Sequence, residues 1–168
     1  MRKASSSLIV IERKTNGRQR MFKRASYIKT SPEAINAFSG GAGYLETSSI
    51  EPKLRYLVQL RVSQINGCAY CVDLHTNQLR REGETEQRID CLVVWREVPF
   101  YDERERAALA WAETVTLIKD THAPDSAYEA VSAEFPEKEL VDLTLVVADM
   151  NFWNRLAISF RRLPGRRG

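Results

Sequence analysis

Apolar residues recur along most of the chain at the three- and four-residue spacing of amphipathic helices. The clearest stripe follows Pro52 and consists of Leu54, Leu57, Val58, Val62 and Ile65. No segment alternates apolar and polar residues for long, which is the pattern expected of a half-buried strand. The pattern therefore predicts an all-α fold.

Start and stop signals divide this pattern into separate helices. Ser31, Pro32 and Glu33 stand in the right order for a helix start, but the glycines at 40, 41 and 43 leave its end open. The helix from residue 52 should stop at Asn66-Gly67. The next should begin at or just before Cys68 and end at Gly83, a residue type that often terminates helices.

The second half of the chain carries similar signals. Residues 85–95 should form a short helix, and Asp102 with Glu105 has the spacing of a capping box before an apolar stripe over residues 108–118. Pro124-Asp125 and Pro136-Glu137 mark two further starts. Residues 140–160 are apolar on most of their circumference, so we expect a central helix or part of a subunit interface in a homo-oligomer.

Length and composition favour a single domain. The chain has 168 residues, and a hydrophobic share of 43% suffices for a core without disulfide staples. Residues 1–23 are rich in Ser, Lys and Arg and lack useful periodicity, so we expect a basic, disordered extension there. The helical domain should then occupy residues 24–168.

The charge distribution and the cysteine count narrow the function classes. The formal net charge is +3, but residues 1–20 contain six basic side chains and one acid, so the excess belongs to the extension. This argues against nucleic acid as a partner. No apolar run suits a secretory signal or a membrane span, and three cysteines do not suit a secreted disulfide scaffold. We therefore expect a cytoplasmic protein with no membrane partner.

The run GCAYCVDLH carries the most informative chemistry. Cys68 and Cys71 are three residues apart and His75 follows four later, so a helix would present all three on one face. The two sulfurs could close a disulfide, and a helix start together with an imidazole one turn away would favour a thiolate. This pattern predicts a redox pair.

Two other interpretations of the pair stay open. A structural zinc site usually needs four ligands, and this run supplies three; Cys91 or His122 could add a fourth only after folding. The pair could also be two inert buried cysteines. Cys91 itself suits a small buried hydrophobe, and His122 suits a loop near a helix end.

The remaining conspicuous side chains suit structural roles. Trp95, Trp111 and Trp153 suit core or interface anchors, and Asp73 and Glu82 suit solvated helix charges. Gly40-Gly41-Ala42-Gly43 lacks the pattern of a phosphate-binding loop.

The segment EPKLRYLVQLRVSQINGCAYCVDLHTNQLRREGETEQRI resembles the core motif of the alkylhydroperoxidase D-like proteins, within the carboxymuconolactone decarboxylase superfamily. The resemblance continues through WREVPFYDERERAALAWAE and FWNRLAISFR, and covers roughly residues 24–162. It implies an all-α fold with the Cys pair at the start of a helix by a subunit-lined pocket. It also implies assembly as dimers or trimers, including hexamers.

The resemblance further implies a mechanism. Cys71 would attack the peroxide, Cys68 would resolve the sulfenic acid as a disulfide, and His75 would help to deprotonate the nucleophile. The family commonly has a glutamate twelve positions before the first cysteine, where this chain has Tyr56. A phenol with a pKa near 10 cannot relay a proton as a carboxylate does, so Tyr56 is a candidate pocket residue and Glu51 a candidate substitute acid.

The expected function is reduction of hydrogen peroxide or small organic hydroperoxides, without metal or flavin, and with a dithiol or protein thiol as reductant. A lactone decarboxylase is a second enzymatic interpretation, disfavoured because that branch is not built on a CxxC pair. The sequence is also compatible with a non-catalytic oligomeric binding or stress-response module, or with a thiol-reductant adaptor.

Overall fold

The computed structural model describes residues 24–166, and within them every regular element is a helix, which confirms the predicted all-α class. The prediction of a basic extension over residues 1–23 lies outside the described residues. The elements are α1 (Tyr27–Thr30), α2 (Pro32–Glu46), α3 (Pro52–Asn66), α4 (Ala69–Arg81), α5 (Glu86–Cys91), the 3-10 helix η1 (Leu92–Glu97), α6 (Glu103–Thr116), α7 (Ile118–Thr121), α8 (Asp125–Ser132) and α9 (Glu137–Ser159).

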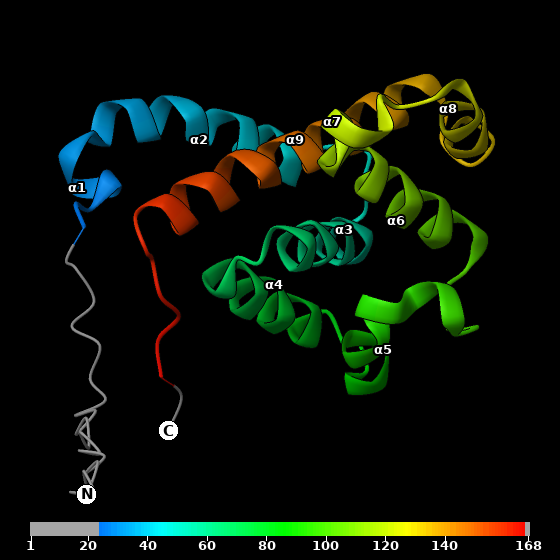
Figure 1. The fold of residues 1–168 in the computed structure, drawn as a ribbon, viewed down its shortest axis with the longest axis horizontal. Coiled ribbons are helices and arrows are strands. Elements are labelled where there is room, and N and C mark those ends of the chain that lie inside the picture. The colour runs from blue at the N-terminus through cyan, green and yellow to red at the C-terminus, as the bar shows by residue number, and fades with distance from the viewer. Residues whose placement is uncertain (1–23, 167–168) are drawn as a thin grey trace, which may run out of the picture.

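Helix α3 is the centre of the packing, with α4, α6 and α9 arranged around it (Figure 1). Its apolar residues divide between two buried clusters. Leu54, Val58 and Val62 pack with residues of α6, α8 and α9, whereas Leu57 and Leu60 pack with residues of α4, α5, η1 and α6. Because both sides of α3 are covered, its residues are the ones best placed to line an internal site.

The predicted end of α3 and the predicted start of α6 are confirmed, and α4 ends at Arg81, two residues before the predicted Gly83. Gly67 ends α3 in the left-handed conformation, with φ at 70°, which glycine adopts at little steric cost. The Asp102 side chain accepts a hydrogen bond from the backbone N–H of Glu105, and the Glu105 side chain accepts one from Asp102, so the capping box is complete.

Other boundaries differ from the prediction. Helix α2 continues through all three glycines to Glu46, and the stacking of Phe38 on Phe152 of α9, with ring centroids 4.7 Å apart, holds this stretch in place. The helix predicted over residues 85–95 is two elements, α5 and η1, with a non-helical Val94 inside the second. The stripe over residues 108–118 is also interrupted, because α6 ends at Thr116. At each of these points the observed boundary differs from the one that local propensity indicates.

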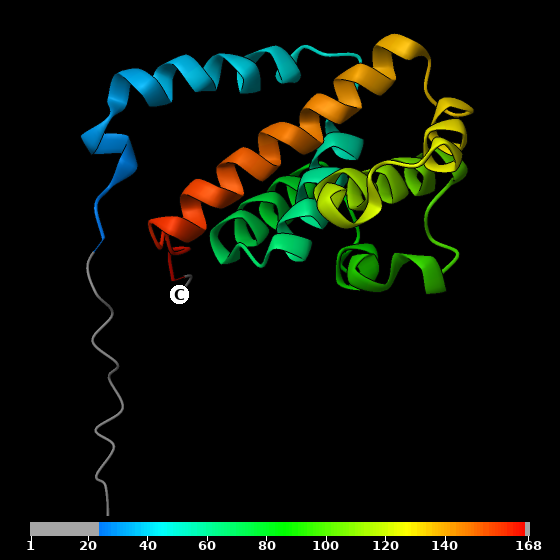
Figure 2. The same cartoon turned by 45° about the horizontal axis from the view of Figure 1, so that its top comes forward.

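Helix α9 packs on α3 and α6, as expected of a central helix, but leaves Val141, Leu145 and Ile158 exposed. Helix α2 lies along α9 and diverges from it toward α1 (Figure 2). Assembly into an oligomer stays a prediction. Within residues 24–166, no helix combines the length and the apolar character that crossing a bilayer would require.

Candidate redox site

The Cys pair lies at the start of α4. Cys68 is the N-cap residue, and its backbone N–H donates to the Ser63 carbonyl oxygen at 3.0 Å. A disulfide joins Cys68 to Cys71, with the two Cα atoms 5.4 Å apart. The backbone N–H of Cys71 also points at the Cys68 Sγ, at 3.4 Å. The first sulfur therefore lies where the helix N-terminus stabilises negative charge.

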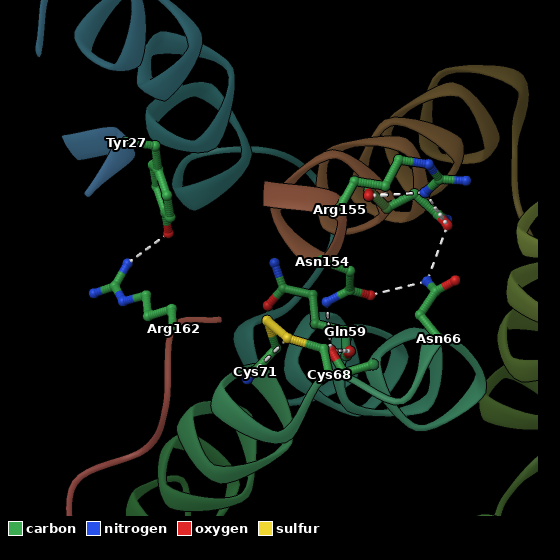
Figure 3. Close-up of a disulfide and its surroundings, with 10 residues drawn as sticks. Tyr27, Gln59, Asn66, Cys68, Cys71, Asn154, Arg155 and Arg162 are labelled. Atoms are coloured by element: carbon green, nitrogen blue, oxygen red, sulfur yellow. Dashed lines mark hydrogen bonds between the residues drawn. A yellow bond between two sulfur atoms is a disulfide. The ribbon is translucent and has the colours of Figure 1, made fainter. Parts of the chain in front are cut away.

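A partly buried polar network fixes this turn against α9 (Figure 3). Asn66 donates to the side-chain oxygens of Asn151 at 3.0 Å and Asn154 at 2.9 Å. Asn154 in turn donates to the Ser63 hydroxyl, which donates to the Gln59 carbonyl oxygen. The end of α3 and the start of α4 are thus held by the helix that follows much later in the chain.

His75 lies one turn after Cys71 on the same face of α4 and is 5% exposed. Its Nδ1 lies 2.8 Å from the Gln78 Oε1, an acceptor, so Nδ1 carries the proton and Nε2 presents a lone pair. Burial lowers the pKa of His75 to about 4, although the bond to Gln78 acts the other way. Nε2 is buried and has no hydrogen-bond partner among the described residues. His75 is therefore neutral at physiological pH.

A cavity of about 240 Å³ opens beside this face of α4. Cys71 and His75 belong to its wall, whereas Cys68 does not. Gln59 of α3 lies beside the disulfide in Figure 3, and its buried Oε1 also has no partner among the described residues. The remaining wall is contributed by α1, α2, α3, α9 and the segment after α9. Only one residue of the pair thus meets the cavity.

The structure places the two candidate relay residues differently. Tyr56 lines the cavity, and its ring stacks toward the His75 ring with centroids 6.5 Å apart. Glu51 instead pairs with Arg104 of α6 and is not part of the cavity wall. The structure therefore brings Tyr56 beside His75 in the cavity wall and leaves Glu51 outside the cavity.

Several cavity residues were missed by sequence reasoning. Arg55 is 5% exposed within the wall, although it stands between two core leucines in the sequence. Trp153 lines the cavity and donates its Nε1–H to Asp149 at 2.9 Å, so it is more than the predicted anchor. Gln78, three residues after His75, could have been found from helical spacing alone. The others come from different helices, and no local signal marks them.

One wall is closed by residues from the two ends of the described chain. The Cζ atom of Arg162 lies 3.9 Å from the centroid of the Tyr70 ring. The Arg162 guanidinium also donates to the Tyr27 hydroxyl at 3.0 Å (Figure 3). Tyr70 directly precedes Cys71, so this contact lies close to the sulfur that meets the cavity.

The other singled-out residues lie elsewhere. Cys91 is a free thiol at the end of α5 and is half-buried rather than buried, and His122 caps α7 in the left-handed conformation. Trp95 and Trp111 are buried, as expected of core anchors. Glu82 is exposed and Asp73 is half-buried. Across residues 24–166, no three His, Cys, Asp or Glu side chains converge as a metal site would require.

The model of the carboxymuconolactone decarboxylase family matches residues 30–114, about half of the chain. The uncharacterized protein YdfG of Bacillus subtilis (strain 168) is 43% identical over 139 residues, which are 83% of this chain and 95% of YdfG. The chain belongs to the carboxymuconolactone decarboxylase family.

Solved structures place this family member among the AhpD-like proteins. Protein ATU0492 of Agrobacterium tumefaciens, of unknown function and with a suggested role as the antioxidant defence protein AhpD, is 43% identical with a TM-score of 0.84, covering 86% of this chain and 99% of its own. An uncharacterized peroxidase-related protein from Silicibacter sp. TM1040 is 26% identical with a TM-score of 0.72, over 80% of this chain and 71% of its own. The debrominase Bmp8, 19% identical with a TM-score of 0.71 over 82% and 74%, shares the fold alone.

Proposed function

We propose that this AhpD-like protein is a thiol-dependent peroxidase that reduces hydrogen peroxide or small organic hydroperoxides through Cys68 and Cys71. The observation that carries the proposal is that Cys71 and His75 share one wall of a cavity which Cys68 does not reach. A peroxide entering from the cavity would meet Cys71 first. The similarity to ATU0492, a protein of unknown function with a suggested role in antioxidant defence, and to an uncharacterized peroxidase-related protein supports this proposal.

The catalytic cycle follows from this placement. The Cys71 thiolate attacks the distal peroxide oxygen, the O–O bond breaks, and an alcohol or water leaves after taking one proton. Cys71 becomes a sulfenic acid. The Cys68 thiolate then attacks the Cys71 sulfur, which forms the disulfide and releases water. A dithiol or two thiols return the two electrons and restore the pair.

The N-terminus of α4 assists two steps, the formation of the disulfide by Cys68 and its later reduction by an external thiol. It assists the first attack of Cys71 on the peroxide less. The Cys71 N–H that points at the Cys68 Sγ stabilises a Cys68 thiolate, which is the attacking group in resolution. When an external thiol attacks Cys71 from the cavity, the same thiolate is the leaving group, and a stabilised thiolate leaves faster. The sulfur that meets the cavity and the sulfur behind it therefore have different tasks.

His75 would supply the base for the first step. Its unprotonated Nε2 is free to accept the Cys71 proton, but a buried imidazole with a pKa near 4 holds that proton poorly. Tyr56, at the place where the family commonly has a glutamate, offers no carboxylate to balance the resulting charge. This observation favours a second candidate function, a thiol-reductant adaptor in which disulfide exchange is faster than peroxide reduction.

Peroxide consumption by the purified protein with a dithiol reductant tests the proposal, with metal analysis of the same sample. Cys71→Ser should abolish turnover, whereas Cys68→Ser should still form a sulfenic acid on Cys71 that a dimedone-type reagent traps. Activity that persists in Cys71→Ser, with the trap on Cys68, would reverse the two roles. A protein that exchanges disulfides but consumes no peroxide would be the adaptor.

We also propose that the chain forms a homo-oligomer. The apolar side chains exposed on α2 and α9 support it: Phe38, Tyr44, Val141, Leu145 and Ile158. Light scattering at low micromolar concentration that finds only monomer would contradict it.

A further inference from the structure

Arg55 of α3 is a buried cation in the wall of the redox cavity. It is 5% exposed, and its Nη1 donates to the Leu45 carbonyl oxygen at 2.6 Å. No carboxylate within residues 24–166 forms an ion pair with it. A guanidinium has five N–H donors in a fixed fork, so one carbonyl satisfies a small part of its capacity. Burying such a charge is costly unless something pairs with it.

The two acids of the cavity wall do not supply that pairing. Glu46 is exposed on the rim. Burial raises the pKa of Asp149, whose carboxylate accepts the Trp153 Nε1–H at 2.9 Å. Neither forms an ion pair with Arg55. The other arginine of the wall, Arg162, is exposed and already engages two tyrosines. Arg55 is thus the cation whose remaining donors are available to a molecule in the cavity.

The other side chains of the cavity wall suit a ligand that contains a ring. Tyr56 lies under the Arg55 guanidinium, 5.1 Å from ring centroid to Cζ, and Tyr70, Trp153, Leu74 and Met150 add aromatic and aliphatic surface. A volume of about 240 Å³ lies just below the roughly 300–1,000 Å³ of pockets for drug-sized ligands. It would accommodate a single-ring molecule. Cys71 belongs to the same wall as Arg55.

We propose that the preferred substrate is a small organic hydroperoxide carrying a carboxylate, which Arg55 binds while the hydroperoxide group reaches Cys71. This inference rests on the proposed peroxidase function. A carboxylate matches the guanidinium fork with two parallel hydrogen bonds and neutralises the buried charge. The aromatic and aliphatic wall would hold the body of the substrate. Hydrogen peroxide would react at the same Cys71 sulfur, but it has no carboxylate for Arg55 to bind.

Matched substrates test the proposal directly. Cumene hydroperoxides with a carboxylate at the meta or para position are compared with their methyl esters, and the ratio of kcat/KM for acid and ester is measured within each protein variant. A charge-assisted hydrogen bond predicts a ratio on the order of 10 to 100 for the wild type with at least one isomer. Arg55→Met should bring the ratio close to one, and Arg55→Lys should leave an intermediate ratio.

Arg81→Met is the control for net charge. Arg81 is exposed near the end of α4 and does not line the cavity, so its removal should keep the wild-type ratio. A ratio near one for both isomers in the wild type would overturn the proposal and leave the peroxidase standing. If Arg55→Met fails to fold, the acid-to-ester ratios of kcat/KM for the wild type and Arg55→Lys still test the proposal.

Binding of benzoate, measured by calorimetry with the disulfide intact, separates this inference from the proposed function. Benzoate binding that Arg55→Met weakens at least tenfold and Arg81→Met does not would support the anion site even if no hydroperoxide is consumed. Benzoate binding that is equal in the wild type and Arg55→Met would overturn the site, whatever the turnover.

Discussion

Two buried polar regions of this protein are organised in opposite ways. Asp142 of α9 is 1% exposed and accepts hydrogen bonds from the Tyr44 hydroxyl, from Ser49 and from the Lys138 ammonium. Burial alone would raise the pKa of Asp142, but Lys138, Ser49 and Tyr44 outweigh it and hold the pKa well below the usual range. Here every buried group has a partner within the chain.

The cavity beside Cys71 and His75 contains the opposite arrangement. Arg55 has one backbone partner, and His75 Nε2 and Gln59 Oε1 have none among the described residues. Unpaired buried groups reduce stability, so a protein retains them where they meet a substrate or a proton. The polar groups around Asp142 thus join α2 to α9, whereas the cavity groups are the ones that the proposed function would use.

The pH dependence of stability gives the largest expected contrast. Unfolded His75 binds a proton with a pKa near 6.5, whereas the folded residue does so near 4. Between these values the unfolded state holds more protons, so the free energy of unfolding should fall as the pH drops from 6.5 to 4, by about 3 kcal/mol from this residue. His75→Gln should remove this loss, as measured by urea unfolding at several pH values.

The carboxylates titrate in both the wild type and His75→Gln. The difference between their free energies of unfolding at each pH therefore reports on His75 alone. Curves for the wild type and His75→Gln that stay parallel from pH 7 to 4 would contradict the assignment of a buried, neutral His75.

The second contrast is between the contributions of Asp142 and Arg55 to the free energy of unfolding. Asp142→Asn should lower the free energy of unfolding at pH 7 by about 2 kcal/mol, because charge-assisted hydrogen bonds are lost. Arg55→Met should change it by less than about 1 kcal/mol, since an apolar side chain of similar length replaces a poorly paired cation. Chemical denaturation of both variants measures this. The reverse order would mean that Arg55 is chiefly structural.

Tyr56→Glu gives the smallest expected effect. A carboxylate beside His75 should raise the pKa of the imidazole, so that it holds the Cys71 proton, and peroxide turnover near pH 7 should rise about tenfold. Tyr56→Phe keeps the ring and removes the hydroxyl, so it controls for packing. Should the Glu variant fold normally and turn over no faster, a missing relay is not what limits this protein.

Much of the fold follows from local sequence. The proline at the start of α3, the glycine after it and the capping box of α6 act within one turn of the chain, so their effects are visible in the sequence. The break between α5 and η1 and the continuation of α2 through three glycines were not predicted, because no local residue pattern marks either of them.

The spacing of Cys68, Cys71 and His75 was sufficient to predict that they lie together at the start of one helix, since helical geometry depends only on spacing. Only the tertiary structure decided which sulfur meets the cavity, that Tyr56 rather than Glu51 lies beside His75, and that Arg55 and Trp153 complete the wall. These residues belong to helices far apart in the chain. Their proximity depends on how α3, α4 and α9 pack, and no local pattern encodes that.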